Sequence, residues 1–334
     1  MRKVLGLLLG ISLSAMGQQR PQYTQYVFNN YILNPAITGI ENYMDVKAGY
    51  RSQWEGLTDA PATSSISLHL PLGKSFLWSN ANSFSEKGSN PMNRSYLQTY
   101  RASESHHGVG FHLVTDRAGP ISRTDINATY AYHLGISEQL NISVGVAGGV
   151  SMLHLDLSKV RLEQVEDRAV MEGENARTQP DLAMGVWLYS ARYFAGISAQ
   201  QLLGRPIAFT SDPAYDQGKQ VPHFFITGGY KFFLNDDMAA IPSIMVKSVS
   251  PAPVSVDANL KVAFKDKFWL GGSYRKNDSF AAMAGFNLSY LFNLSYAYDF
   301  TTSDIKSVSG GSHEIVLGLL LNNRYRVTCP QKNW

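Results

Sequence analysis

Apolar and polar residues alternate one by one along most of the chain. From Val254 to Val262, every even-numbered residue is apolar and every odd-numbered residue is polar. Because successive side chains of a β-strand point to opposite faces, this pattern predicts a strand with one apolar and one polar face. The pattern recurs about fourteen times, in segments of roughly nine to thirteen residues, the length of a tilted strand that crosses a bilayer. We therefore expect an all-β fold, an antiparallel transmembrane β-barrel of the outer-membrane type with about 14 strands.

The expected strands form an even set, as single-chain bacterial barrels require. In order, they span residues 43–53, 63–72, 106–116, 122–134, 139–150, 180–188, 192–200, 221–233, 238–248, 253–262, 267–275, 279–287, 290–299 and 312–321. The barrel is thus expected to occupy residues 43–321, and residues 322–334 form a C-terminal periplasmic tail.

The connections between these strands differ in length at the two ends of the barrel. With a periplasmic N-terminus, the even-to-odd connections are periplasmic, and most are short: 135–138, 189–191, 234–237, 263–266 and 288–289. Several of the extracellular connections are longer: 54–62, 151–178, 201–220 and 300–311. This asymmetry is typical of outer-membrane barrels. The exception is the long Ser- and Asn-rich stretch 73–105, which we expect to be a periplasmic insertion or to contain a further hairpin.

The first 17 residues have the pattern of a cleaved signal peptide. Arg2 and Lys3 precede the apolar stretch 4–15, and small residues stand at Ala15 and Gly17. The stretch is too short to cross a membrane as a helix, and no apolar run beyond it approaches the roughly 18 residues that a spanning helix needs. The signal and the strands together predict an outer-membrane protein, with a buried N-terminal helix as the alternative for residues 1–17.

Residues 18–42 carry Pro21 and Pro35 and are not expected to form a strand. We expect one helical turn at 29–33 and a segment that folds into the barrel as a plug, because its aromatic residues would otherwise lie in water. The residues expected in the plug are Tyr26, Phe28, Asn34, Pro35 and Ala36. A loose periplasmic tail is the alternative.

The composition agrees with a membrane barrel, since only 16% of the residues are charged and 12% are aromatic. Aromatic residues at strand ends would place their rings at headgroup depth. The candidates are Trp54, Trp187, Tyr193, Tyr230, Phe232, Trp269 and Tyr274. The net charge of +3 comes without a Lys/Arg run, so no nucleic-acid partner is expected. A secreted soluble β-protein is the alternative class.

Few residues point to chemistry. His106 and His107 are adjacent and would face opposite sides of a strand, while His112 and His133 lack a Cys or carboxylate cluster at ligand spacing. We therefore expect no metal and no cofactor. Ser67, His69 and Asp257 share the lumen side in this register, but no nucleophile motif accompanies them, so no catalytic site is expected.

Charged residues within the strands must point inward, since a charge that faces lipid costs about 2–4 kcal/mol at mid-depth. The expected lumen-facing charges, which would pair across the barrel or hold the plug, are Asp45, Lys47, Arg51, Asp257, Lys261 and Arg275. The expected partner-binding rim comprises Trp54, Glu163, Arg168, Glu172 and Arg205, with a merely solvated loop as the alternative. Cys329 is the single cysteine, so it pairs with another protein or stays unpaired.

The opening carries a PQ-x-TQY-x-F motif and an NPA motif, at Pro21, Gln22, Thr24, Gln25, Tyr26, Phe28, Asn34, Pro35, Ala36 and Gly39. A YR-x-QW-x-G…AP segment follows, at Tyr50, Arg51, Gln53, Trp54, Gly56, Ala60 and Pro61. An HEI strand at 313–315 is followed by Cys329-Pro330. In these segments, and in the stretches 108–120 and 180–202, the chain resembles the PorP/SprF family of Bacteroidetes outer-membrane proteins.

The resemblance covers essentially the whole mature chain and implies a role in type IX secretion and gliding motility. Some members resemble core secretion components, and others hold a very large secreted adhesin at the cell surface through its C-terminal domain. The implied partners are such a secreted protein, periplasmic or lipoprotein components, and outer-membrane lipid. The NPA segment is also similar to the plug of long-chain fatty-acid transporters, so a FadL-like channel for a hydrophobic solute is the alternative function.

Overall fold

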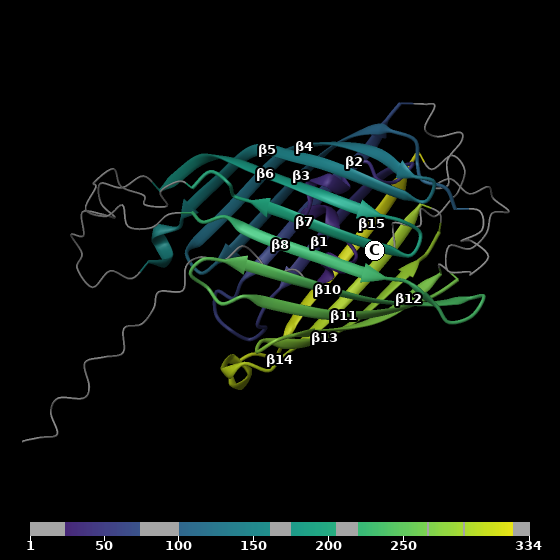
Figure 1. Cartoon of the computed structure of the whole chain (residues 1–334). Coiled ribbons are helices and arrows are strands. Elements are labelled where there is room, and N and C mark those ends of the chain that lie inside the picture. The colour runs from purple at the N-terminus through teal and green to yellow at the C-terminus, as the bar shows by residue number, and fades with distance from the viewer. Residues whose placement is uncertain are drawn as a thin grey trace, which may run out of the picture.

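The computed structural model describes residues 24–73, 100–160, 175–204 and 220–322, apart from 266 and 290. Its strands form one antiparallel sheet that closes through the pairing of β10 with β11, as Figure 1 shows. The strands are β1 (Met44–Ser52), β2 (Ala62–Leu72), β3 (His106–Ala118), β4 (Ile121–Ser137), β5 (Leu140–Leu155), β6 (Ala176–Tyr189), β7 (Tyr193–Gln200), β8 (His223–Tyr230), β9 (Phe232–Phe233), β10 (Met238–Val249), β11 (Ser255–Phe264), β12 (Phe268–Arg275), β13 (Ser279–Asn287), β14 (Phe292–Thr301) and β15 (Ser312–Leu321).

β8 and β9 are two parts of one spanning strand. Both pair with β10 in a single register, with Gly229 opposite Ser243 and Phe232 opposite Ala240. The interruption lies beside Pro242, whose nitrogen carries no hydrogen for the ladder. Counted in this way, fourteen strands cross the barrel, and the prediction of an all-β barrel of about 14 strands is confirmed.

The two ends of the barrel differ. The turn end carries the short connections 138–139, 190–192, 234–237, 265–267 and 288–291, and the long connection 73–105 leaves β2 at this end too. The loop end carries the longer connections 53–61, 156–175, 201–222 and 302–311. The loop expected at 151–178 is shorter than predicted, because backbone pairing of β5 with β4 and β6 continues past Val150, where the apolar alternation weakens.

Side chains alternate between lipid and lumen along each strand. On β5, Asn141 and Ser143 are buried inside while Val144 and Val146 are exposed outside. The expectation that Trp187 and Trp269 anchor the barrel at headgroup depth is wrong: they are 1% and 4% exposed and face the interior. Both rings fill the lumen, so their positions near strand ends misled the prediction. Among the described residues, no helix is both long and apolar enough to span a bilayer.

Residues 24–43 run through the ring of strands (Figure 1). They form three short 3₁₀ helices, η1 (Gln25–Val27), η2 (Asn30–Ile32) and η3 (Pro35–Ile37), rather than the one helical turn expected. The segment starts at Thr24 beside the loop-end residues of β1, β14 and β15 and reaches β1 at Met44 on the turn end. Among the described residues, the loop-end connections also contain the 3₁₀ helices η4 (Leu157–Lys159) and η6 (Asp304–Ser307).

Candidate functional site

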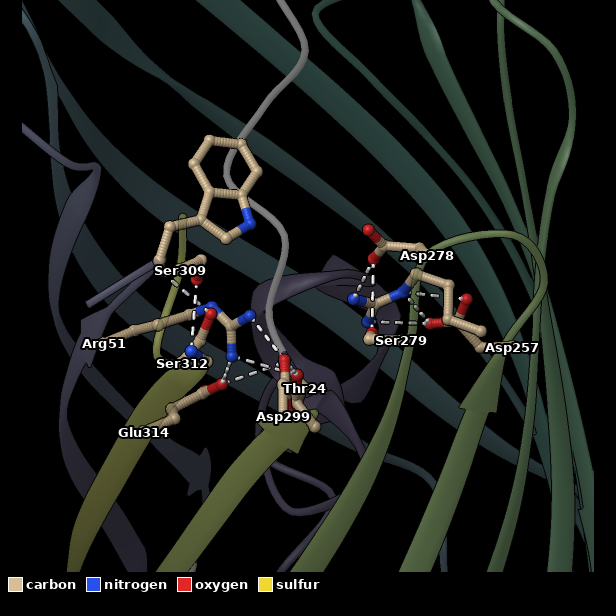
Figure 2. A network of polar contacts seen from close by, with 12 residues as sticks. Thr24, Arg51, Asp257, Asp278, Ser279, Asp299, Ser309, Ser312 and Glu314 are labelled. Carbon is tan, nitrogen blue, oxygen red and sulfur yellow. Dashed lines mark hydrogen bonds and ion pairs between the residues drawn. The ribbon is translucent and has the colours of Figure 1, made fainter. Parts of the chain in front are cut away.

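The start of the N-terminal segment is held by a buried ion cluster at the loop end. Arg51 Nη2 lies 2.6 Å from Asp299 Oδ2, and Arg51 Nη1 lies 2.9 Å from Glu314 Oε2. Thr24 sits among these groups: its backbone N–H donates to Glu314, its hydroxyl donates to Asp299, and Arg51 donates to its hydroxyl oxygen (Figure 2). One arginine thus joins β1, β14, β15 and the N-terminal segment.

The Asn34-Pro35-Ala36 sequence fits into a recess of the wall. Asn34 caps η3 by accepting from the N–H of Ala36, and its Nδ2 donates to the carbonyl oxygens of Val186 and Ile197. Proline suits the first helical position because the N–H that it lacks would have no partner there. The wall opposite has glycines: a Cβ on Gly185 would lie 2.0 Å from Asn34 Oδ1.

Polar side chains of the wall bind backbone carbonyls of the segment. Ser143 Oγ donates to Ala36 O at 2.7 Å, and Ser198 Oγ donates to Leu33 O at 2.7 Å. Gln200 Nε2 donates to both Ile32 O and Leu33 O at 2.9 Å. Short 3₁₀ turns leave many carbonyls without a partner inside the helix, and buried carbonyls need one. These wall residues meet that need.

Three histidines, which we call the histidine clasp (His69, His106 and His133), surround the turn at Thr38 and Gly39. His133 Nε2 lies 2.8 Å from Thr38 O, and His106 Nε2 lies 3.1 Å from Gly39 O. The N–H of Gly39 donates to His69 Nδ1 at 3.1 Å. The rings of His106 and His133 stack with their centroids 4.4 Å apart. The clasp therefore contacts the carbonyl oxygens of Thr38 and Gly39 and the N–H of Gly39.

Two aromatic residues of the segment, Tyr26 and Phe28, pack against β11 and β12. Asn259 donates to the Tyr26 hydroxyl at 2.6 Å, and the rings of Phe28 and Trp269 lie 6.1 Å apart. Lys47 Nζ lies 5.3 Å from the Phe28 ring centroid, and Lys261 Nζ lies 5.3 Å from that of Trp269. Two inward lysines thus cover one buried aromatic cluster.

All six charges expected in the lumen are buried on its wall. Besides Arg51, they form two close pairs: Arg275 bonds Asp257 on the neighbouring strand at 3.1 Å, and Lys47 bonds Asp45 at 2.6 Å. Arg275 also bonds Asp278, the second group drawn in Figure 2. Because Asp257 binds Arg275 while His69 binds Gly39, the structure does not join Ser67, His69 and Asp257 into a catalytic arrangement.

Within the part of the chain that the structure describes, one group of residues has the composition of a metal site. Potential ligand atoms of Glu41, Asp45 and His69 lie within 4.8 Å of one another. Lys47 already donates to Asp45, and Gly39 already donates to His69. Of these three residues, His69 bonds the N-terminal segment directly, by accepting the N–H of Gly39.

Of the residues expected on the partner-binding rim, the structure describes Trp54. It lies in the 53–61 connection at the loop end, and its N–H donates to Ser312 Oγ. Glu163, Arg168, Glu172, Arg205 and Cys329 lie outside the described residues, as do residues 1–23 and most of the 73–105 connection.

Sequence reasoning missed several residues that hold the segment. Glu314 lies directly opposite Arg51 in the β1–β15 register, so the alternation and the pairing order together could have found it. Asp299 binds Arg51 from β14, two strands from β1, and His133, which the sequence presents only as a possible metal ligand, contacts Thr38 O. No local pattern ties either residue to the segment.

A family model described as type IX secretion system membrane protein PorP/SprF matches residues 15–319. No curated protein matches the chain. Two solved structures have a TM-score of 0.50. The CymD monoaromatic hydrocarbon channel is 11% identical, with coverage of 89% of this chain and 91% of that chain. The Ralstonia pickettii toluene transporter TbuX is 10% identical, with coverage of 88% and 94%. At such identities the likeness shows the barrel fold alone.

Proposed function

The chain belongs to the PorP/SprF family of type IX secretion system membrane proteins and is an outer-membrane β-barrel, and we propose that it anchors a secreted protein at the cell surface. Family and fold are those of a secretion-system membrane barrel rather than of an enzyme class. In this proposal the barrel is non-enzymatic and binds the C-terminal domain of a large type IX cargo such as an adhesin, and so supports its secretion or gliding motility.

The observation that carries the proposal is the lumen contact of residues 24–43. The wall bonds this segment from Thr24 at the loop end to Gly39 near the turn end. A barrel whose inner wall already bonds a segment of its own chain is better suited to hold a partner protein than to conduct a solute. We infer that the segment, including Tyr26, Phe28, Asn34, Pro35 and Ala36, acts as a plug.

The loop end is the proposed binding face and the proposed cell-surface side, because longer connections on the outside are typical of these barrels. Its rim would include Trp54 and the charged residues Glu163, Arg168, Glu172 and Arg205. Charges on such a rim steer encounter and select the partner more than they add affinity. Periplasmic or lipoprotein components would bind at the turn end.

The test is to purify the tagged protein from native outer membranes in mild detergent and to identify co-eluting proteins by mass spectrometry. A large secreted protein that is lost in Trp54→Ala and retained in Leu288→Ala, a control at the turn end where Leu288 is 66% exposed, supports the anchor. Recovery of periplasmic or lipoprotein secretion components alone would favour a core machinery role instead.

A second candidate function is transport of a hydrophobic solute. It is favoured by the likeness of the fold to a monoaromatic hydrocarbon channel and a toluene transporter. Solute uptake by liposomes distinguishes transport from anchoring. The liposomes contain the wild type, a deletion of residues 18–42, or the variant Ser198→Ala/Gln200→Ala, which removes bonds between the wall and the segment. Uptake by the wild type contradicts a simple anchor, whereas uptake only after the deletion supports a plugged barrel.

A further inference from the structure

A hollow lies on the outer face of the barrel at the loop end. It has a volume of about 550 Å³ and is lined by Tyr274, Asn277, Phe280 and Thr302. These residues come from the end of β12, the turn that follows it, the start of β13 and the residue after β14. The hollow lies outside the lumen, so the holding of the N-terminal segment does not use it.

The floor of the hollow is aromatic. Tyr274 and Phe280 are cross-strand neighbours with ring centroids 4.8 Å apart, and they are 43% and 52% exposed. Phe280 in turn lies opposite Phe300 on β14, which is also exposed. Their sequence neighbours Ser273, Arg275 and Ser279 are buried. The floor therefore faces away from the lumen and is continuous with the lipid-facing surface.

The upper wall of the hollow is polar and neutral. Asn277 and Thr302 line it, and their side chains carry an amide and a hydroxyl. The N–H of Thr302 donates to Asp278 O at 2.8 Å, which ties the end of β14 to the 276–278 turn. The Asp278 carboxylate accepts from Arg275 and Ser279, so it is engaged on the lumen side of the turn. Lys276, in the same turn, is exposed.

We infer that this hollow binds the sugar headgroup of a glycolipid in the surrounding leaflet. The hollow opens outward and is continuous with the lipid-facing surface, so lipid covers it. Aromatic rings are suited to the boundary between acyl chains and headgroups. A pyranose ring offers flat C–H faces for the aromatic floor and hydroxyl groups for Asn277 and Thr302. A phosphoethanolamine headgroup has no flat apolar face to place there. The exposed Lys276 is suited to a phosphate on the same sugar.

The inference rests on the orientation proposed above, with the loop end at the cell surface. Antibody labelling of an epitope inserted after Ser307 in intact cells checks that orientation separately from binding. If the epitope is hidden, the proposed orientation fails and the glycolipid assignment to the outer leaflet fails with it. If the epitope is labelled, the lipid-binding measurement tests the site alone.

The binding test uses native mass spectrometry of the full-length protein in detergent, titrated with lipid A or with phosphatidylethanolamine. We expect lipid A to bind preferentially and Tyr274→Ala/Phe280→Ala to weaken that binding about tenfold, which corresponds to about 1.4 kcal/mol, because the variant removes both rings of the floor. The matched control, Phe268→Ala/Phe286→Ala, removes an outward cross-strand pair from the same two strands at the turn end and should bind as the wild type does.

A milder variant keeps the test decisive if the double variant does not fold. Thr302→Val removes one hydroxyl and keeps the shape of the side chain, and it should weaken lipid A binding severalfold without changing the heat-dependent gel mobility of the barrel. Equal binding of the two lipids to the wild type overturns the inference. An equal loss of lipid A from the site and control pairs overturns it as well, because that result describes a general aromatic belt.

Discussion

At the scale of single residues, the lumen is organised by a few side chains that contact several chain segments at once. Arg51 is the clearest case, since its two terminal nitrogens reach Asp299, Glu314 and Thr24. The HEI sequence at 313–315 shows the alternation at work. Glu314 points inward to Arg51, while His313 points outward, 2.6 Å from the Tyr296 hydroxyl and 2.8 Å from Glu55.

Replacing Arg51 should be severe. Arg51→Gln leaves the carboxylates of Asp299 and Glu314 buried without the cation between them, so we expect a loss of about 3–5 kcal/mol in the free energy of unfolding. Denaturant unfolding in detergent micelles measures it. Arg51→Lys keeps the charge but cannot bond both carboxylates through two nitrogens. We expect it to lose less free energy of unfolding than Arg51→Gln. Equal stability of Arg51→Gln and the wild type would contradict this role.

The histidine clasp makes a separate prediction. His133→Phe keeps a ring to stack on His106 but leaves Thr38 O without its donor, at a cost of about 1–3 kcal/mol. We expect faster hydrogen exchange at the amides of Thr38 and Ile40, which are bonded within the segment. His107→Phe, on the outer face of the same hairpin, is the control and should leave this exchange unchanged. Unchanged exchange in His133→Phe would mean that the clasp does not hold the segment.

At the scale of elements, the N-terminal segment and the wall fit because small wall residues stand where the segment approaches closely. A Cβ on Gly145 would lie 2.4 Å from Pro35 O, whereas a Cβ on Gly148 of the same strand would meet nothing within 4 Å. Gly145→Ala should therefore destabilise the barrel by about 1–3 kcal/mol through overpacking. Gly148→Ala should not. Thermal unfolding of the two variants side by side tests the fit, and equal behaviour would argue against it.

The loop element η4 makes a pH prediction. Asp156 caps η4 by accepting from the N–H and hydroxyl of Ser158, and these bonds hold the pKa of Asp156 below its usual value. Because the folded pKa is depressed, the cap is fully formed above the unfolded pKa and is lost as pH falls through the folded value. Carbon NMR titration of the Asp156 carboxyl should show a higher midpoint in Ser158→Ala. An unchanged midpoint would contradict the cap.

At the scale of the whole molecule, the question is whether the N-terminal segment must move for function. A Cβ at Gly185 would lie 2.8 Å from Asn34 Cγ, so the pair Asn34→Cys/Gly185→Cys is placed to form a disulfide between segment and wall. In a Cys329→Ser background, we expect the oxidised variant to retain its secreted partner in co-purification, because an anchor works with its lumen filled. Loss of the partner on oxidation and recovery on reduction would show that the segment moves.

Much of the architecture follows from the chain itself. The two-residue alternation predicts the strands, their number and the inward charges, because facing lipid is costly for every charged side chain regardless of its neighbours. The strand ends were less predictable, since β5 and β6 continue through pairing that no apolar pattern marks. Pro242 lies within β10, beside the interruption at Lys231 of the neighbouring strand. The position of this interruption depends on the strand order, which the local sequence does not give.

By itself, the sequence determined the barrel class and the even strand count, because these depend on local periodicity and on the solvent. Only the tertiary structure decided which inward residues meet. Thr24, Arg51, Asp299 and Glu314 are joined across up to 290 residues, and Trp187 and Trp269 turned out to fill the lumen rather than anchor the rim. Such contacts arise from closing the sheet around a segment whose path, from the loop end to the turn end, no local pattern encodes.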